Sequence, residues 1–228
     1  NNNRIFLKSN LIIICASTIQ TLRLLLNSQE NNNEDGFIDP SASLGLNLMD
    51  HISSCRFFSM PNSNKNLNEV SNKKKNVLSG SGSFFIPFGN RHKIFNNADF
   101  IRGYGIWGGI DRFQLPNFIK RNPNSKIGFL IGHGEVLANK NNKVTLSEIK
   151  DKWGIKIPNI DCKWGENERK MVKHMNKTIE EIIVNADGEI NSLEKLLYLP
   201  FIDKLTKNAI ALQEQSPPPG YYIHEVGG

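Results

Sequence analysis

Five short runs of apolar, aromatic and small residues fill the middle of the chain. The runs are ISSCRFFSM (52–60), GSFFIPF (82–88), ADFIRGYGIWGG (98–109), KIGFLIGHGEV (126–136) and NKVTLS (142–147). Loops rich in Asn, Gly, Pro and Lys separate them. Strand-length runs bounded by turn-forming residues are typical of strands that pair with their neighbours along the chain. The spacing therefore predicts a mostly antiparallel sheet.

Helical periodicity begins where these runs end. From residue 166 onward apolar residues recur every three or four positions, which predicts a long amphipathic helix. Its apolar face consists of Met171, Val172, Met175, Ile179, Ile182 and Ile183. The glutamates of this segment, Glu168 among them, fall on the polar face and are expected to be solvated. A second helix is predicted over about 191–199.

The first fifty residues also mix strand and helix signals. Residues 4–17 predict two short strand segments around a polar break, and STIQTLRLLLNS (17–28) has helical spacing. A short helix is expected over 44–51, whereas 61–77 predicts a mobile surface insertion because it offers little to bury. The whole pattern predicts the α+β fold class.

The distribution of charge and the length of the apolar runs argue against a nucleic-acid partner and against a membrane-spanning segment. The net charge is +6, but the basic residues are dispersed among asparagines, as in NSNKNLNEVSNKKKN, without a stripe of stacking aromatics. We therefore expect a solvated basic surface and no nucleic-acid partner. The longest apolar run, LIIICA at 11–16, is far shorter than the roughly 20 residues that span a bilayer, so no membrane segment is expected.

The cysteines bear on compartment. Cys15, Cys55 and Cys162 lie far apart and form no C-x-x-C pair, so neither a disulfide framework nor a zinc site is expected. This favours a reducing compartment such as the cytoplasm, with the periplasm as the alternative. The sequence has neither an initiator Met nor a basic-then-apolar leader, and we expect it to be part of a longer protein.

One motif imitates a cofactor site. Gly103, Gly105 and Gly108 form a literal G-x-G-x-x-G, which indicates dinucleotide binding only where it closes a strand and opens a helix. The residues that follow, GIDRFQLPNF, contain Gly and Pro and no helical apolar face. We therefore interpret these glycines as part of a strand that bends or approaches a neighbour closely.

The histidines carry no metal signature. His51, His92, His133 and His174 have no histidine or glutamate four residues away, so we expect no metal centre. His224 lies in the last stretch, SPPPGYYIHEVGG (216–228). From those residues alone it is either an ordinary terminal histidine or half of an active site.

Several separated stretches together resemble the glucose–methanol–choline (GMC) oxidoreductases, flavoenzymes that oxidise alcohols. NLIIICASTIQTLRLLLNS is similar to the family's strand–turn–helix V-I-L-A-A-G-A-I-x-S-P-x-L-L-L-x-S, and SLGLNLMDH to its G-x-x-L-x-D-H. IHEVGG is similar to H-P-x-G-T or H-E-x-G-G. FIRGYGIWGG, GHGEVLANKNNKVTLS and DKWGIKIPNIDCKWGENERKMVKHM resemble the substrate-domain core of a bacterial sugar-dehydrogenase-like branch. The matches follow the family's order and span nearly the whole chain.

The resemblance implies part of a two-domain flavoenzyme fold. Residues 1–50 would belong to a partial FAD-binding domain, 51–215 to a substrate-binding domain with an antiparallel sheet and helices, and 216–228 to a return toward the active site. The family's flavin fingerprint would lie upstream of these residues and its second active-site residue, a His or Asn, downstream. This implies an internal or C-terminal fragment that is inactive alone. A degenerate non-catalytic GMC remnant and a basic surface-binding module are the alternatives.

The resemblance also assigns residues and chemistry. FAD would accept a hydride from the CH–OH group of a sugar, polyol or other alcohol, with an electron acceptor that the sequence does not identify. His224 matches the catalytic base; an imidazole ordinarily titrates near pH 6.5 and so can accept the hydroxyl proton at neutral pH. Cys15, Ala16 and Ser17 replace the family's Ala-Gly-Ala and would contact FAD, with strand-to-helix packing as the alternative. The aromatic residues Phe100, Tyr104 and Trp107 are possible lining or core.

Overall fold

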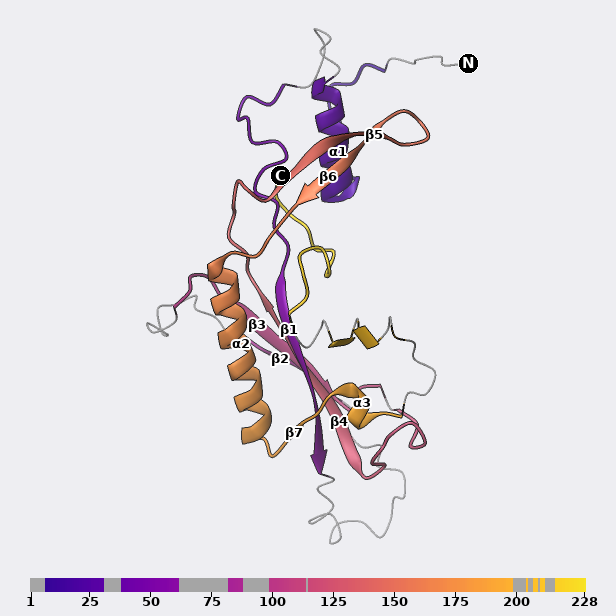
Figure 1. The fold of residues 1–228 in the computed structure, drawn as a ribbon, viewed down its shortest axis with the longest axis vertical. Helices are drawn as coiled ribbons and strands as arrows, with labels where there is room; N and C mark the ends of the chain where they lie inside the picture. The colour runs from indigo at the N-terminus through magenta and orange to yellow at the C-terminus, as the bar shows by residue number, and fades with distance from the viewer. Residues whose placement is uncertain are drawn as a thin grey trace. The chain divides into compact units, whose positions relative to one another are not determined.

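The computed structural model describes residues 7–30, 38–61, 82–87, 99–113, 115–198, 204, 207–208, 210–211 and 216–228. The chain divides into two units (Figure 1). The first unit consists of Asn1–Met49, Ala138–Cys162 and Glu225–Gly228, and the second of Asp50–Leu137 and Lys163–His224. Among the described residues, each unit has its own sheet, which packs with one helix in the first unit and lies with two helices in the second.

The second unit contains an antiparallel sheet in the order β2-β3-β4-β1-β7. Its strands are β1 (Ile52–Pro61), β2 (Gly82–Ile86), β3 (Tyr104–Ile110), β4 (Ser125–Gly134) and β7 (Glu189–Ile190). Four of the five predicted runs thus form strands of one antiparallel sheet, and this prediction is confirmed. The central pair β1 and β4 is in register from Ile52 opposite Gly134 to Pro61 opposite Ser125.

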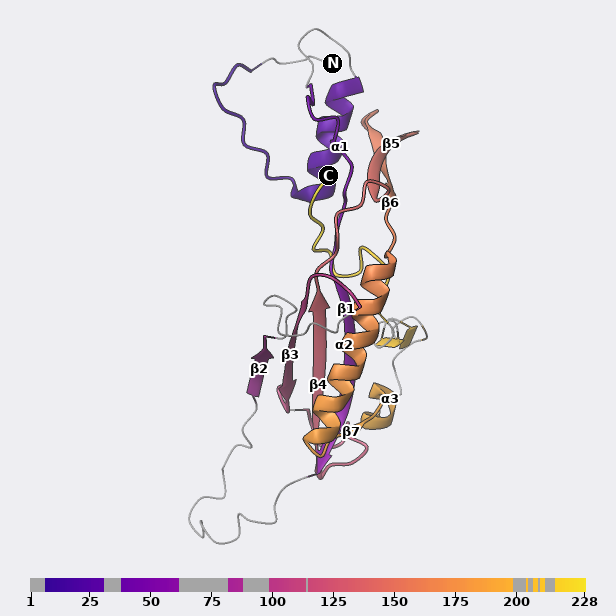
Figure 2. The same cartoon turned by 90° about the vertical axis from the view of Figure 1, so that its left-hand side faces the viewer.

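One face of this sheet packs against the predicted long helix, α2 (Glu166–Asn185), which Figure 2 shows running along β4 and β1. The helix buries Met171, Met175, Ile179 and Ile183, as its periodicity predicts. Two glycines in β4 permit the close approach: a Cβ on Gly132 would meet Met175 Cγ at 2.6 Å, and one on Gly134 would meet Met171 Sδ at 2.7 Å. We call this face of the sheet the helix face.

The start of α2 corrects one expectation. Glu168 is buried rather than solvated, and its carboxylate accepts hydrogen bonds from the backbone N–H of Gly165 at 2.9 Å and of Leu137 at 3.1 Å. A carboxylate in the first helical turn satisfies N–H groups that have no partner inside the helix, which explains why this glutamate turns inward.

The opposite face of the sheet follows from strand alternation. Residues next to those that contact α2 point the other way, so this face carries Ser53, Trp107, Ile131 and His133, and we call it the histidine face. At one end it holds an apolar pocket lined in part by Phe57, Phe129 and a short helix, α3 (Leu193–Leu196). The helix predicted over about 191–199 is therefore a single turn within the described residues.

The first unit packs α1 (Ser17–Glu30) against a two-stranded antiparallel sheet of β5 (Lys143–Lys150) and β6 (Lys156–Asp161). Its core contains Leu22, Leu48 and Val144. Arg23 fixes the helix to the β5–β6 connection because its guanidinium binds the Asp151 carboxylate at 2.5 Å and the Lys156 carbonyl oxygen at 2.9 Å. The predicted helix at 17–28 is confirmed.

Two predictions in this unit are wrong. Residues 44–51 form no helix, because Gly45 and Asn47 adopt left-handed backbone angles (φ 81° and 61°) that interrupt helical hydrogen bonding. Residues 7–16 contain no strand, and Leu11, Ile12 and Ile13 are exposed. In the described part of the chain no neighbouring strand pairs with this apolar segment.

The observed mixture is an α+β fold with antiparallel sheets. The two units are bounded differently from the expected ranges 1–50, 51–215 and 216–228, since Ala138–Cys162 and Glu225–Gly228 group with the N-terminal part of the chain. The assignment of the expected ranges to FAD-binding and substrate-binding domains stays a prediction. The expected insertion at 61–77 lies outside the described residues from 62 onward.

Candidate functional site

A buried carboxylate joins the first strand of the second unit to the C-terminal segment. Asp50 is 4% exposed and lies two residues before the start of β1. Its Oδ1 accepts hydrogen bonds from the backbone N–H of His51 at 2.7 Å and of His224 at 3.3 Å, and its Oδ2 accepts one from Gly220 at 2.8 Å. Asp50 therefore fixes the backbone of residues 220–224 at the end of β1.

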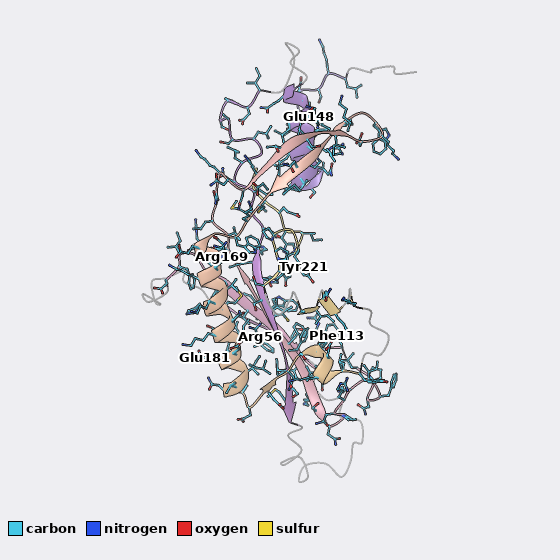
Figure 3. The ribbon with its side chains drawn as sticks, viewed as in Figure 1. Arg56, Phe113, Glu148, Arg169, Glu181 and Tyr221 are labelled. Carbon is cyan, nitrogen blue, oxygen red and sulfur yellow. The ribbon has the colours of Figure 1, made fainter. Side chains whose placement is uncertain are left out.

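This anchor assembles three imidazole rings. The ring centroid of His51 lies 5.4 Å from that of His224 and 6.1 Å from that of His133. His51 follows Asp50, His133 comes from β4, and His224 comes from the C-terminal segment, whose Tyr221 is labelled in Figure 3. Three motifs that are distant in the sequence therefore converge at one end of the sheet. His51 and His224 are exposed, whereas His133 is partly buried.

His133 lies on the histidine face, opposite Ser53 of β1 and Gly105 of β3. Its Nδ1 accepts a hydrogen bond from the Nε1–H of Trp107 at 3.3 Å. Burial is the main cause that lowers the pKa of His133 to about 4, and the neighbouring His51 and His224 add to the effect against the opposing influence of Asp50. The ring is therefore neutral at pH 7. Its Nε2 is buried and has no hydrogen-bond partner among the described residues.

Tyr222 closes the cluster from the C-terminal segment. Its ring packs edge-on against His133 with centroids 4.9 Å apart, and its hydroxyl oxygen accepts a hydrogen bond from Ser53 Oγ at 2.7 Å. Burial raises the pKa of Tyr222, and the bond from Ser53 opposes that rise. The phenol is thus protonated at neutral pH and cannot serve there as a base.

Trp164 holds the beginning of the C-terminal segment. Its Nε1–H donates to the Pro217 carbonyl oxygen at 3.1 Å, and Pro217 is fully buried. The proline-rich stretch therefore has a structural role, because it delivers Tyr222 and His224 to the cluster along a fixed path.

The structure places the predicted base, His224, inside this cluster. Sequence reasoning missed its neighbours Asp50, His133 and Tyr222. Asp50 lies in LMDH, His133 in GHGEV and Tyr222 in SPPPGYYIHEVGG, and the proximity of the first two motifs depends on the register of β1 against β4. The exposed imidazole of His224 beside the neutral, partly buried imidazole of His133 offers a proton acceptor and a hydrogen-bond donor to one small polar group.

The predicted FAD contacts belong to the first unit. Cys15, Ala16 and Ser17 are exposed and immediately precede or begin α1. Ser17 has a left-handed backbone (φ 62°), so it, rather than Ala16, occupies the conformation that glycine adopts without strain. Backbone N–H groups at a helix start lack partners within the helix, and an exposed start is open to a polar ligand.

Residues that follow His224 contact the same helix start within the first unit. Thr18 Oγ1 donates to the Glu225 carbonyl oxygen at 2.6 Å. Met49 and Val226 exchange two backbone hydrogen bonds of 2.9 and 3.0 Å. The segment EVGG thus lies against both α1 and the residues that lead into Asp50.

The three aromatic residues considered as pocket lining lie on different faces of the five-stranded sheet. Phe100 and Tyr104 are buried in the core of the helix face, and the Tyr104 hydroxyl contacts His174 Nδ1 at 2.8 Å. Trp107 lies on the histidine face and belongs to the site through its bond to His133.

Two further expectations concern motifs. The G-x-G-x-x-G stretch lies in and beside β3, between β2 and β4, so its interpretation as strand glycines is confirmed. Across the described ranges, no group of three or more His, Cys, Asp or Glu side chains is placed to hold a metal ion. Within the same ranges, none of the helices has the length and apolar character needed to cross a membrane.

Comparison with known proteins adds no relative: no protein-family model matches the chain, and no curated protein matches it.

Proposed function

We propose that this chain is part of an FAD-dependent oxidoreductase of the GMC type, which oxidises the CH–OH group of a sugar, a polyol or another alcohol. The observation that supports the proposal best is the convergence of the motifs LMDH, GHGEV and IHEVGG on one histidine cluster. The sequence resemblance rests on these motifs separately, so their convergence is a second, geometric argument.

In this proposal His224 is the base. Its imidazole accepts the proton of the substrate hydroxyl while the C–H bond breaks and the carbonyl forms. Asp50 is a positioning residue in this proposal. Its carboxylate binds the backbone N–H of His224 and transfers no proton to or from the substrate. FAD, when bound, supplies the acceptor for the hydride.

The residues proposed to hold FAD fit such a ligand. Cys15, Ala16 and Ser17 are exposed, and the first backbone N–H groups of a helix such as α1 have no partner inside the helix. The side chains of these three residues are small, as a close approach of a flat ring or a phosphate to the backbone requires.

The test uses the intact protein purified from its natural gene. We expect flavin absorbance that bleaches when a sugar or alcohol from a substrate panel is added without air. His224→Gln should keep the flavin but slow its reduction by about 10²–10⁴-fold, which is the usual contribution of a general base. The matched control is His174→Gln, since His174 lies on the helix face and should leave the reduction rate unchanged.

Three results would reject the proposal. A folded, colourless protein would indicate a non-catalytic remnant. A flavoprotein whose reduction does not depend on His224 would remove the assigned base. Strongly salt-dependent binding to nucleic acid or anionic surfaces, without flavin, would instead favour a basic surface-binding module.

A further inference from the structure

The tautomer of His133 follows from its partner. The indole Nε1–H of Trp107 is a donor only, so Nδ1 of His133 must accept and therefore carries no proton. A neutral imidazole has one proton, which must then be on Nε2. The ring stays neutral at pH 7 because burial and two neighbouring imidazoles disfavour its charged form.

The proton on Nε2 is a donor with no acceptor among the described residues. Buried polar groups in folded proteins nearly always have partners, and those that lack one are frequent at binding and catalytic sites. The groups around this ring are His51, His224, Asp50 and Tyr222. Asp50 is not the missing acceptor, because its carboxylate binds the backbone N–H groups of His51, Gly220 and His224 and forms no hydrogen bond with Nε2.

We propose that His133 is a neutral hydrogen-bond donor whose Nε2–H binds the oxygen atom of the alcohol substrate, with Trp107 as the positioning residue that fixes its tautomer. This inference rests on the proposed function for the identity of the ligand. It assigns to His133 a role that differs from that of His224: one imidazole donates a hydrogen bond to the oxygen, and the other accepts the proton.

The two roles balance in a single step. The O–H bond breaks and its proton passes to His224, while the C–H bond breaks and its electron pair leaves with the hydrogen toward the flavin. The oxygen becomes alkoxide-like before the carbonyl forms. A donor fixed in advance at that oxygen stabilises the developing negative charge more than it stabilises the neutral alcohol. A neutral N–H donor at His133 is sufficient for this stabilisation, so the ring does not have to carry a positive charge.

Access to Nε2 passes the neighbouring side chains. His51 and His224 are exposed, and exposed side chains change rotamer within nanoseconds. The proposal therefore requires that a rotamer change of these two side chains admits the alcohol oxygen to Nε2, while the sheet that holds His133 stays as it is.

The first test measures the tautomer directly. Histidine ¹⁵N NMR of the full 228-residue chain should show His133 with a protonated Nε2 and an unprotonated Nδ1 throughout the neutral pH range. Isobutyramide, whose carbonyl oxygen resembles that of the product, should shift the Nε2 and Hε2 signals. Trp107→Phe should keep the bulk of the site but give a mixture of both tautomers.

The second test measures catalysis in the intact flavoprotein. His133→Phe should lower the rate of flavin reduction by about 10²–10³-fold, the usual loss for one donor to a developing oxyanion. His133→Gln keeps an N–H donor and should restore part of the rate. If His133→Phe does not fold, the rate of flavin reduction in His133→Gln is compared with that of the wild type instead. A glutamine can donate a hydrogen bond but cannot act as a base, so a partly retained rate supports the donor role and a complete loss supports a base role.

The outcomes separate this inference from the proposed function. An Nδ1–H tautomer, or an Nε2 signal that isobutyramide does not move, overturns the inference even in an active enzyme. The expected tautomer and shift, in a protein that binds no flavin, support an oxygen-binding site while rejecting the redox reaction.

Discussion

The two faces of the five-stranded sheet use neighbouring residues for opposite purposes. On the helix face Met171, Met175 and Ile179 of α2 fill the space above glycines and apolar side chains, and all three are fully buried. On the histidine face the alternate positions carry Ser53, His133 and Trp107, which form hydrogen bonds rather than a dry core. In Figure 3 Tyr221 is labelled near one end of this unit's sheet, whereas Phe113, which lines the apolar pocket, is labelled beside its middle. The helix face therefore holds the main apolar core of this unit, whereas the histidine face holds a hydrogen-bonded group of polar side chains.

The largest expected loss of stability comes from a substitution in the core of the helix face. Met175→Ala should lower the free energy of unfolding by about 2–5 kcal/mol, because the side chain is fully buried and the rigid sheet cannot collapse into the cavity. Urea unfolding followed by circular dichroism measures this loss. The His133 ¹⁵N signals should stay unchanged at low urea; if they move, the two faces are not independent.

The next effect concerns the anchor of the C-terminal segment. Asp50→Asn weakens three hydrogen bonds to a charged acceptor, each worth about 1.5–3 kcal/mol, so stability should fall by an amount in that range or above. The specific signature is faster amide hydrogen exchange at Gly220 and His224.

Asp111→Asn is the matched control for that prediction. Asp111 is a carboxylate at the other end of the same sheet, where it accepts a bond from Ile127 N–H at 3.2 Å and pairs with Lys120 at 3.5 Å. Its substitution should cost stability without changing exchange at His224. Equal exchange in both variants would show that Asp50 does not position the segment.

The pH dependence of stability tests His133. Its pKa is about 4 in the folded chain against 6.5 for an unperturbed histidine, so between these values the unfolded chain binds more protons. The stability is complete above pH 6.5 and falls as the pH drops toward 4, by on the order of 1 kcal/mol once solvent screening of a partly exposed ring is allowed for. His133→Gln should flatten this part of the stability profile, and an unchanged slope would contradict the assignment.

The smallest effect compares adjacent serines on the two faces. Ser53→Ala removes a hydrogen bond to Tyr222 and should cost about 0.5–1.5 kcal/mol while raising the pKa of Tyr222 further. Ser54→Ala acts on the helix face, where Ser54 Oγ accepts a bond from Arg56 at 3.2 Å, and should leave Tyr222 unchanged. Alkaline titration of tyrosine absorbance distinguishes the two.

Local patterns predicted most of the regular structure and part of the site. The apolar spacing in residues 166–183 was sufficient for α2, since a helix that covers a sheet must bury one stripe. The same reasoning failed at 44–51, where Gly45 and Asn47 take left-handed angles that no apolar period reveals. It also failed at 11–13, because an apolar run forms a strand only where another strand pairs with it.

The sequence by itself determined four of the five strands of the sheet, the helices α1 and α2, and the presence of a histidine in the C-terminal motif. Only the tertiary structure decided that His224 lies with His51 and His133, because that proximity depends on strand register and on the bonds that Asp50 makes. The tertiary structure also decided the protonation state and the tautomer of His133. A proton's position on an imidazole depends on burial and on the partner of the other nitrogen, and neither is written in the neighbouring residues of the chain.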